Sequence, residues 1–171
     1  RCDLRGVSSV QLGMGHALRI DFPGAWQHIF NRALARRAMV EFAIDAMRFE
    51  DLLSDVVERG LLEIHAYCLM TTHFHLLVRS VDGRLSEAMQ LLTGRYSRSF
   101  NRGRGRDGPL FRGRFGSSLV DDDDYWLNVL RYIDLNPVGV LCDVPSDHPH
   151  GSAFHYRRGG GPTWLTRDRV A

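Results

Sequence analysis

Apolar residues recur along the chain with two different periods, and the shorter one marks the β-strands. Residues 26–34 can be read as a strand in which Trp26, His28, Phe30 and Arg32 alternate with Gln27, Ile29 and Asn31, and two largely apolar runs, 61–69 and 73–80, are separated by a short turn. A period of two is typical of a strand, and a short turn makes consecutive strands antiparallel neighbours. A further run, 110–120, predicts a fourth strand.

The longer period predicts helices. Apolar residues recur at helical spacing from about 39 to 59, and Gly60 ends that stretch, as glycine commonly ends helices. Residues 85–102 carry leucine, methionine and phenylalanine on one stripe, which predicts a second amphipathic helix. A third helix is predicted from residue 121. Pro137 ends it, because the residue before a proline is driven out of the α conformation.

The order of these elements is strand, helix, strand, strand, helix, strand and helix. It is typical of an α+β ferredoxin-like sandwich, with a central antiparallel sheet and helices mainly on one face. A length of 171 residues suits one domain. We expect that domain over residues 1–145, followed by a polar, glycine-rich and partly ordered tail over 146–171.

The composition is that of an ordinary globular protein, with 44% hydrophobic and 25% charged residues. No stretch approaches the roughly 18 apolar residues of a membrane span, and residues 1–22 lack the apolar core of a signal peptide. The three cysteines form no CxxC pair, which argues against a disulfide scaffold and against a zinc ribbon. We therefore expect a cytoplasmic protein with no membrane partner.

Positive charge is concentrated in one segment, although the net charge is only +2. All 22 basic residues are arginines, and seven of them lie within 95–115, against a single acid. The aromatic residues interleaved with them are Tyr96, Phe100, Phe111 and Phe115. This mixture suits the phosphates and bases of a nucleic acid, although a solvated helix face followed by a loop would explain it too. The arginines expected at phosphates are first Arg112 and Arg114, then Arg95, Arg98 and Arg102.

Two histidines stand two residues apart in the strand predicted over 73–80. In HFHLLVRS, His73 and His75 share one face with Leu77, and the other face is wholly apolar. Their Cβ atoms would be about 7 Å apart at a rise of about 3.3 Å per residue, and rings at this spacing can bind one metal ion. Two histidines that hydrogen-bond to their neighbours would explain the same pattern.

The third predicted helix has a polar face. Tyr132 and Asn136 are four residues apart and therefore lie on that same face. The four aspartates of 121–124 suit a helix N-terminus through capping and the helix dipole, so they need not bind metal. A packing role for Tyr132 and a capping role for Asn136 before Pro137 would be the purely structural explanations.

Three motifs resemble those of the HUH-type tyrosine transposases, in the branch associated with repetitive extragenic palindromes (REP) and grouped with the IS200-like transposases. They are HAYCLMTTHFHLLVRS, GPLFRGRF and YIDLNPV, in this order along the chain. The resemblance runs from about residue 24 to residue 145. It implies that the predicted domain over 1–145 is the catalytic domain.

The resemblance also implies a reaction. His73, His75 and Asn136 would bind a divalent cation, Mg²⁺ or Mn²⁺, and Tyr132 would be the nucleophile. The implied enzyme is a metal-dependent endonuclease and transposase. It would cut and rejoin single-stranded DNA at hairpin, REP-like sequences through a 5′-phosphotyrosine intermediate. The expected partner is single-stranded or hairpin DNA, bound by a bacterial, nucleoid-associated protein that is a monomer or a homodimer.

The main alternative is a domesticated, catalytically silent descendant that binds DNA hairpins without cutting them. A metallohydrolase built on the HxH pair would need further histidines and aspartates at its site. A replication initiator or relaxase would share the HUH site but usually carries additional domains, which a chain of 171 residues disfavours.

Overall fold

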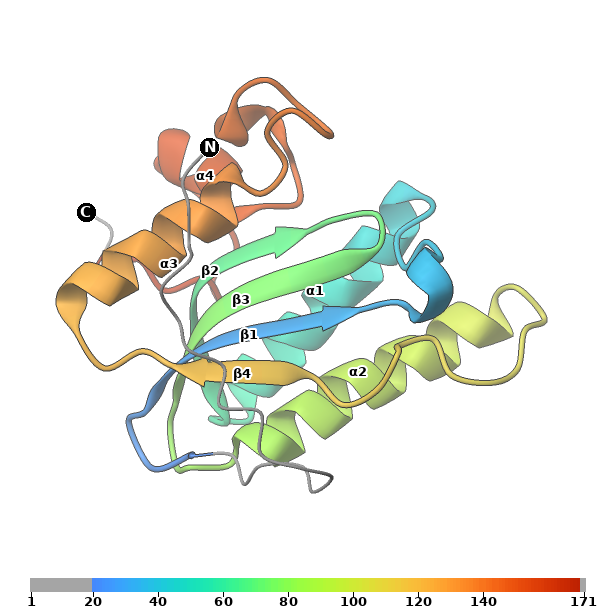
Figure 1. The fold of residues 1–171 in the computed structure, drawn as a ribbon, viewed down its shortest axis with the longest axis horizontal. Helices are drawn as coiled ribbons and strands as arrows, with labels where there is room; N and C mark the ends of the chain where they lie inside the picture. Colours follow the sequence, from blue (N-terminus) through green and yellow to red (C-terminus); the bar gives the residue numbers. More distant parts are fainter. Residues whose placement is uncertain (1–19, 170–171) are drawn as a thin grey trace.

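The computed structural model describes residues 20–169. In these residues, four antiparallel strands form one central sheet (Figure 1). The strands are β1 (Trp26–Arg32), β2 (Leu62–Leu69), β3 (His73–Ser80) and β4 (Gly116–Leu119). They are ordered β2-β3-β1-β4 across the sheet, and each neighbouring pair is antiparallel. One helix connects β1 to β2 and another connects β3 to β4, so the predicted α+β ferredoxin-like fold is confirmed. Residues 1–19 of the domain predicted over 1–145 and residues 170–171 of the tail predicted over 146–171 lie outside the described residues.

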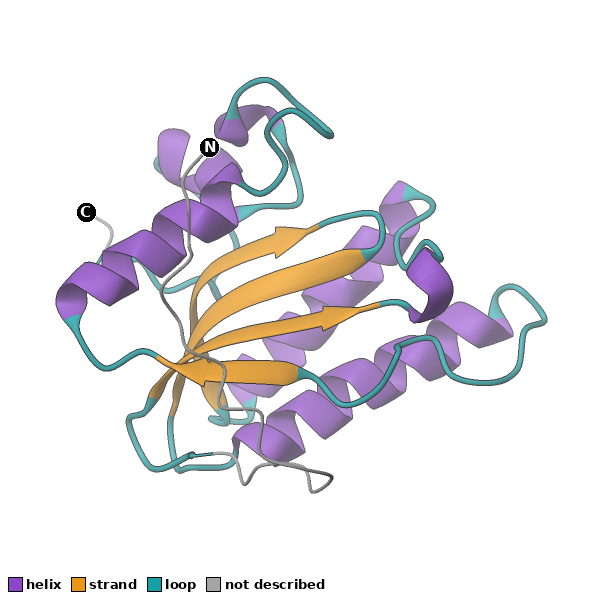
Figure 2. Ribbon diagram, viewed as in Figure 1, coloured by secondary structure: helices purple, strands orange, loops and turns teal. Residues whose placement is uncertain are grey.

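Two long helices cover one face of the sheet, and a third lies on the other. α1 (Ala43–Glu58) and α2 (Leu85–Arg102) lie behind the strands in Figure 2. α3 (Asp123–Leu135) packs against β2 and β3 from the opposite side. A short helix, α4 (Ser152–Arg157), and two 3₁₀ turns, 34–36 and 145–147, are also described. Within residues 20–169, no helix has the length and apolar character needed to cross a membrane.

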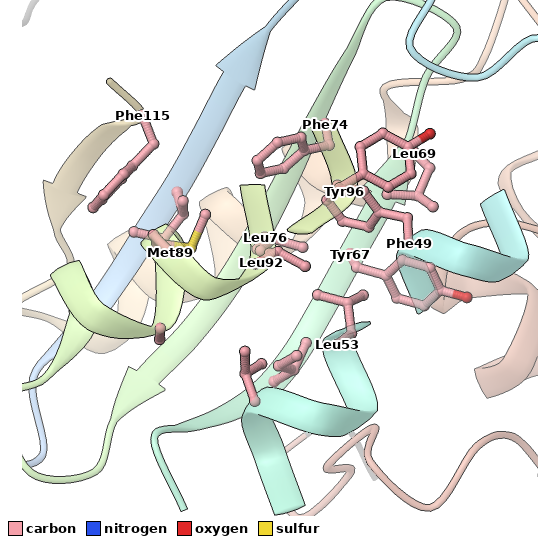
Figure 3. Packing of buried hydrophobic residues seen from close by; sticks show 14 of the residues in the cluster. Phe49, Leu53, Tyr67, Leu69, Phe74, Leu76, Met89, Leu92, Tyr96 and Phe115 are labelled. Carbon is pink, nitrogen blue, oxygen red and sulfur yellow. The ribbon is translucent and has the colours of Figure 1, made fainter. Parts of the chain in front are cut away.

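The main hydrophobic core fills the space between the sheet and helices α1 and α2 (Figure 3). β3 contributes the apolar face predicted for it, with Phe74, Leu76 and Val78 fully buried. From α1, Phe49 packs on Phe74 with ring centroids 4.9 Å apart. Because this side of β3 faces α1 and α2, the alternate residues of β3, including both histidines, point to the other face.

The aromatic residues of the arginine-rich segment belong to this core. Tyr96, Phe100, Phe111 and Phe115 are each at most 8% exposed. Tyr96 and Phe100 lie one turn apart on the buried face of α2, and Phe111 and Phe115 anchor the segment before β4 to the main core. The interpretation of these four rings as base-stacking residues is therefore wrong.

A smaller core fixes α3 on the opposite face. Its apolar stripe packs on Leu77 of β3 and on neighbouring β2 residues, and consists of Trp126, Val129, Leu130 and Ile133. The helix starts where the aspartate run predicts, because the Asp122 carboxylate accepts the backbone N–H of Tyr125 at 2.6 Å. This packing decides which residues of α3 are turned toward the histidines.

Two predicted elements start several residues later in the structure. α1 starts later than predicted, at Ala43, because backbone N–H groups just before it donate to the carbonyl of Thr71 in the β2–β3 turn. Of the strand predicted over 110–120, only β4 forms. The residues before β4 follow the end of β1 along an irregular path, with an isolated bridge between Ala33 and Phe111.

Residues 146–169, within the segment predicted as a partly ordered tail (146–171), fold back along the outer edge of β2. The backbone N–H of Leu69 donates to the carbonyl of His150 at 2.9 Å. Trp164 and Leu165 are buried in the main core. The sequence gives little sign of this packing, because two adjacent apolar residues in a glycine-rich segment show no helix or strand period.

Candidate active site

The two histidines of β3 line a pocket on the sheet face opposite α1 and α2. The rings of His73 and His75 have centroids 5.2 Å apart and are nearly perpendicular. The pocket has a volume of roughly 350 Å³. Its lining residues are His28, Phe30, Asn31, Arg32, His73, His75 and Tyr132. The predicted HxH pair therefore faces a solvent-connected hollow.

Helix α3 brings the predicted tyrosine and asparagine to this pair. The Tyr132 ring stands nearly perpendicular to the His75 ring, with centroids 5.2 Å apart, and it is 42% exposed. One turn later, Asn136 Oδ1 lies 3.1 Å from His73 Nε2. Asn136 also caps α3 through its backbone N–H, so its capping and side-chain roles coexist. The structure thus assembles Tyr132, Asn136, His73 and His75 within one chain.

A third histidine, on β1, joins the cluster. His28 Nε2 lies 3.1 Å from His75 Nδ1, and the two rings are stacked with centroids 5.3 Å apart. The Tyr132 ring lies 5.7 Å from the His28 ring. None of the sequence motifs singles out His28. The sequence does place His28 on the same face of β1 as Phe30. It does not show that β1 pairs with β3, and this pairing is what brings His28 to His75.

Burial holds these imidazoles in the neutral form. It lowers the pKa of His28 to about 4. Burial also lowers the pKa of His75 to about 3, and repulsion from the Arg32 guanidinium, and from His28 and His73 when they are protonated, lowers it further. The pKa of His73 is lowered by burial, partly offset by its hydrogen bond with Asn136. A neutral imidazole keeps a nitrogen lone pair, which a metal ligand requires.

The donor set fits a divalent cation. Thr72 Oγ1 lies 3.1 Å from His73 Nδ1, and His73 Nε2 lies 3.1 Å from Asn136 Oδ1. With its proton on Nε2, His73 donates to the Asn136 oxygen. With the proton on Nδ1, Thr72 accepts it, and the Nε2 lone pair is then available to a cation bound beside the Asn136 oxygen. His28 Nε2 can likewise accept the proton on Nδ1 of His75, which leaves the lone pair on Nε2 of His75 for a cation. Over residues 20–169, no three His, Cys, Asp or Glu side chains form a metal-binding group. A cation here would therefore depend on the Asn136 amide oxygen.

The arginines predicted first for phosphate contacts lie beside the pocket. The Arg112 N–H donates to the carbonyl of Arg32 at 3.0 Å, and Asn31 Nδ2 donates to the carbonyl of Gly113 at 3.3 Å. These bonds fix the segment carrying exposed Arg112 and Arg114 next to two pocket-lining residues of β1. Arg32 itself lines the pocket, and sequence reasoning missed it.

The other predicted arginines are not brought to the pocket. Arg95, Arg98 and Arg102 lie on α2, in the helix layer on the far side of the sheet. Arg95 forms an ion pair with Asp55 of α1. Their assignment to DNA binding stays a prediction, and any DNA they contact would have to extend beyond the pocket.

The fold agrees with what comparisons with known proteins find. The family model described as "Transposase IS200 like" matches residues 23–136, two thirds of the 171-residue chain and all of the assembled pocket. The chain belongs to the IS200-like transposase family. No curated protein matches this IS200-like transposase.

Two solved structures are similar to this IS200-like transposase. One is the REP-associated tyrosine transposase bound to a REP hairpin, with a TM-score of 0.68, 19% identity, and coverage of 91% of this chain and 93% of the other. The other is a candidate transposase from Deinococcus radiodurans, with a TM-score of 0.47, 16% identity, and coverage of 72% of this chain and 96% of the other. The first likeness supports the fold described above.

Proposed function

We propose that this IS200-like transposase cuts and rejoins single-stranded DNA by transesterification, with Tyr132 as the nucleophile. The observation that carries the proposal is the convergence of two elements on one pocket. α3 presents Tyr132 beside His75 and Asn136 beside His73, 63 residues apart in sequence. A tyrosine that only packed its helix would not need a partner residue one turn later that contacts a histidine of the sheet.

We further propose that His73, His75 and Asn136 hold Mg²⁺ or Mn²⁺. When bound, such an ion polarises the scissile phosphate and offsets the charge that builds on its oxygens. His28 would keep the His75 ring oriented, with Nε2 directed to the ion, through the contact at Nδ1. Zinc, nickel or copper would bind the same ligands more tightly, so the choice of ion depends on availability.

The chemical step follows from the position of Tyr132 at the mouth of the pocket. A phenol is a weak nucleophile while it keeps its proton, so the Tyr132 hydroxyl must lose that proton as it attacks. The Tyr132 oxygen forms a bond to phosphorus while the bond from phosphorus to the 3′ oxygen breaks, and that oxygen leaves as a hydroxyl. One phosphate ester replaces another. The free 3′ hydroxyl can therefore reverse the step and rejoin the strand without ATP.

The proposed substrate is hairpin DNA with a single-stranded flank. The similar solved structure is of a REP-associated tyrosine transposase bound to a REP hairpin. In this chain, Arg32, Arg112 and Arg114 would supply phosphate contacts beside the pocket. One copy of the chain assembles the whole pocket, so a second copy is not needed to complete it. A homodimer and an association with the nucleoid stay predictions.

The test uses a hairpin oligonucleotide with single-stranded flanks, Mn²⁺ and a denaturing gel. The unaltered protein should form a covalent protein–DNA adduct, and Tyr132→Phe should bind the hairpin without forming one. Tyr125→Phe is the matched control, since Tyr125 lies two turns earlier on α3, packed against the smaller core. An adduct from Tyr132→Phe would place the nucleophile elsewhere.

Two further results bear on the proposal. His73→Ala should lose cleavage because it loses the cation, and full activity in that variant would remove the metal role. Hairpin binding by the unaltered protein, without an adduct in Mg²⁺ or Mn²⁺, would favour the catalytically silent hairpin-binding alternative.

A further inference from the structure

An exposed phenylalanine lines the pocket. Phe30 is in the middle of the sheet, paired with His75 on one side and with Gly116 on the other. It is nevertheless 40% exposed, on the face where α3 leaves β1 uncovered. Its ring centroid lies 5.4 Å from His28 and 6.1 Å from His75. A large apolar ring is thus presented to solvent beside the proposed reaction site.

The neighbouring strand makes room for this ring. A Cβ atom at Gly116 would lie 2.4 Å from Cε2 and Cζ of Phe30, closer than non-bonded atoms can approach. Gly116 does not have the positive φ that would by itself call for glycine. The residue that needs glycine at this position is therefore Phe30, whose ring lies across the backbone of β4 with one side open to the pocket.

We infer that Phe30 is a stacking platform for a nucleobase of the DNA strand that enters the pocket. The inference rests on the proposed function and adds a subsite to it. The occupant is a base, because Phe30 is paired with His75 of the proposed cation site on one side and, on the other, with Gly116, which follows the segment of Arg112 and Arg114 proposed to contact phosphates. A strand whose phosphates follow these groups would carry a base over Phe30. Stacking on a flat ring tolerates any base, so this subsite would anchor the strand without reading its sequence.

The test compares two single strands with the same number of phosphates. One is a labelled strand of about 12 deoxythymidines, enough to cover a site of the usual 4–16 nucleotides. The other carries abasic residues throughout. Binding is measured in Mg²⁺ with Tyr132→Phe as the starting protein, so that no strand is cut. The quantity compared is the ratio of the Kd for the abasic strand to the Kd for the thymidine strand.

Phe30→Leu should lower this ratio by about tenfold, the size of one base–aromatic stack, by weakening thymidine binding alone. The salt dependence of thymidine binding should be the same in Phe30→Leu as in the starting protein, because no charge is removed. Phe30→Trp should keep the ratio, and its added fluorescence should be quenched by the thymidine strand and not by the abasic one. Gly116→Ala should lower the ratio by displacing the ring. Phe42→Leu, which alters another exposed phenylalanine outside the pocket, should leave it unchanged.

The outcomes separate this inference from the proposed function. If Phe30→Leu and Gly116→Ala both keep the ratio of the starting protein, while the unaltered protein still forms its adduct, the subsite is refuted and the proposed function stands. If the unaltered protein neither binds nor cuts single-stranded or hairpin DNA, both are overturned.

Discussion

Replacing His28 by phenylalanine tests whether the third histidine tunes the proposed cation site. His75 is only 7% exposed, and its Nδ1 lies 3.1 Å from His28 Nε2. Without His28, the buried Nδ1–H of His75 lacks an acceptor, or the proton moves to Nε2 and removes the lone pair that a cation needs. An unsatisfied buried donor costs about 1–3 kcal/mol. Since about 1.4 kcal/mol is tenfold in affinity, we expect His28→Phe to bind Mn²⁺ about 10–100-fold more weakly, the usual effect of losing such a partner.

The assay is a titration of the free protein with Mn²⁺, followed by electron paramagnetic resonance or calorimetry, and it needs no DNA. His28→Gln should recover most of the affinity, because the amide oxygen of glutamine can reach the position of Nε2 and accept the proton. His150→Phe is the matched control, since that histidine contacts Glu50 away from the pocket. If His28→Phe keeps its thermal unfolding midpoint and binds Mn²⁺ as tightly as the unaltered protein, His28 has no such role.

Two further predictions concern stability and charge. Burial raises the pKa of Asp134 to about 6 from its ordinary 3.8, so the folded state binds more protons and stability should fall as pH rises from about 4 to about 6. Asp134→Asn should remove up to about 3 kcal/mol of this decline; urea unfolding of both proteins from pH 4 to pH 8 measures it, and parallel curves would contradict it. Arg112→Gln and Arg114→Gln should each reduce the salt dependence of hairpin binding, by about one in the slope of log Kd against log salt, whereas Arg95→Gln should not. An equal effect of Arg95→Gln would show that DNA also follows α2.

The sequence predicts elements well where one period runs uninterrupted. β3 and α2 have the predicted bounds, because few contacts compete with the hydrogen bonds that each element makes. The start of α1 and the residues before β4 are different. There the backbone bonds to distant partners, including the Thr71 carbonyl, which no local pattern reveals.

The site shows the same division. The pairs His73–His75 and Tyr132–Asn136 each lie within one element, so their common faces follow from strand and helix geometry alone. The part of the site contributed by β1 does not follow from local geometry. His28 reaches His75 across 47 residues of sequence, and only the register of β1 against β3 sets the pairing. The arginine-rich segment misleads for a related reason: it is continuous in sequence but divides between α2 and the chain beside the pocket.

The return of the chain along β2 also bears on self-association. An unpaired outer strand offers a row of free amides and carbonyls on which another polypeptide can add as a strand. On this molecule the residues around His150 already occupy part of that row. Edge-to-edge pairing of copies into larger aggregates is thereby discouraged on that side. Within residues 20–169, the other outer strand on which a second sheet could pair is β4, which is only four residues long.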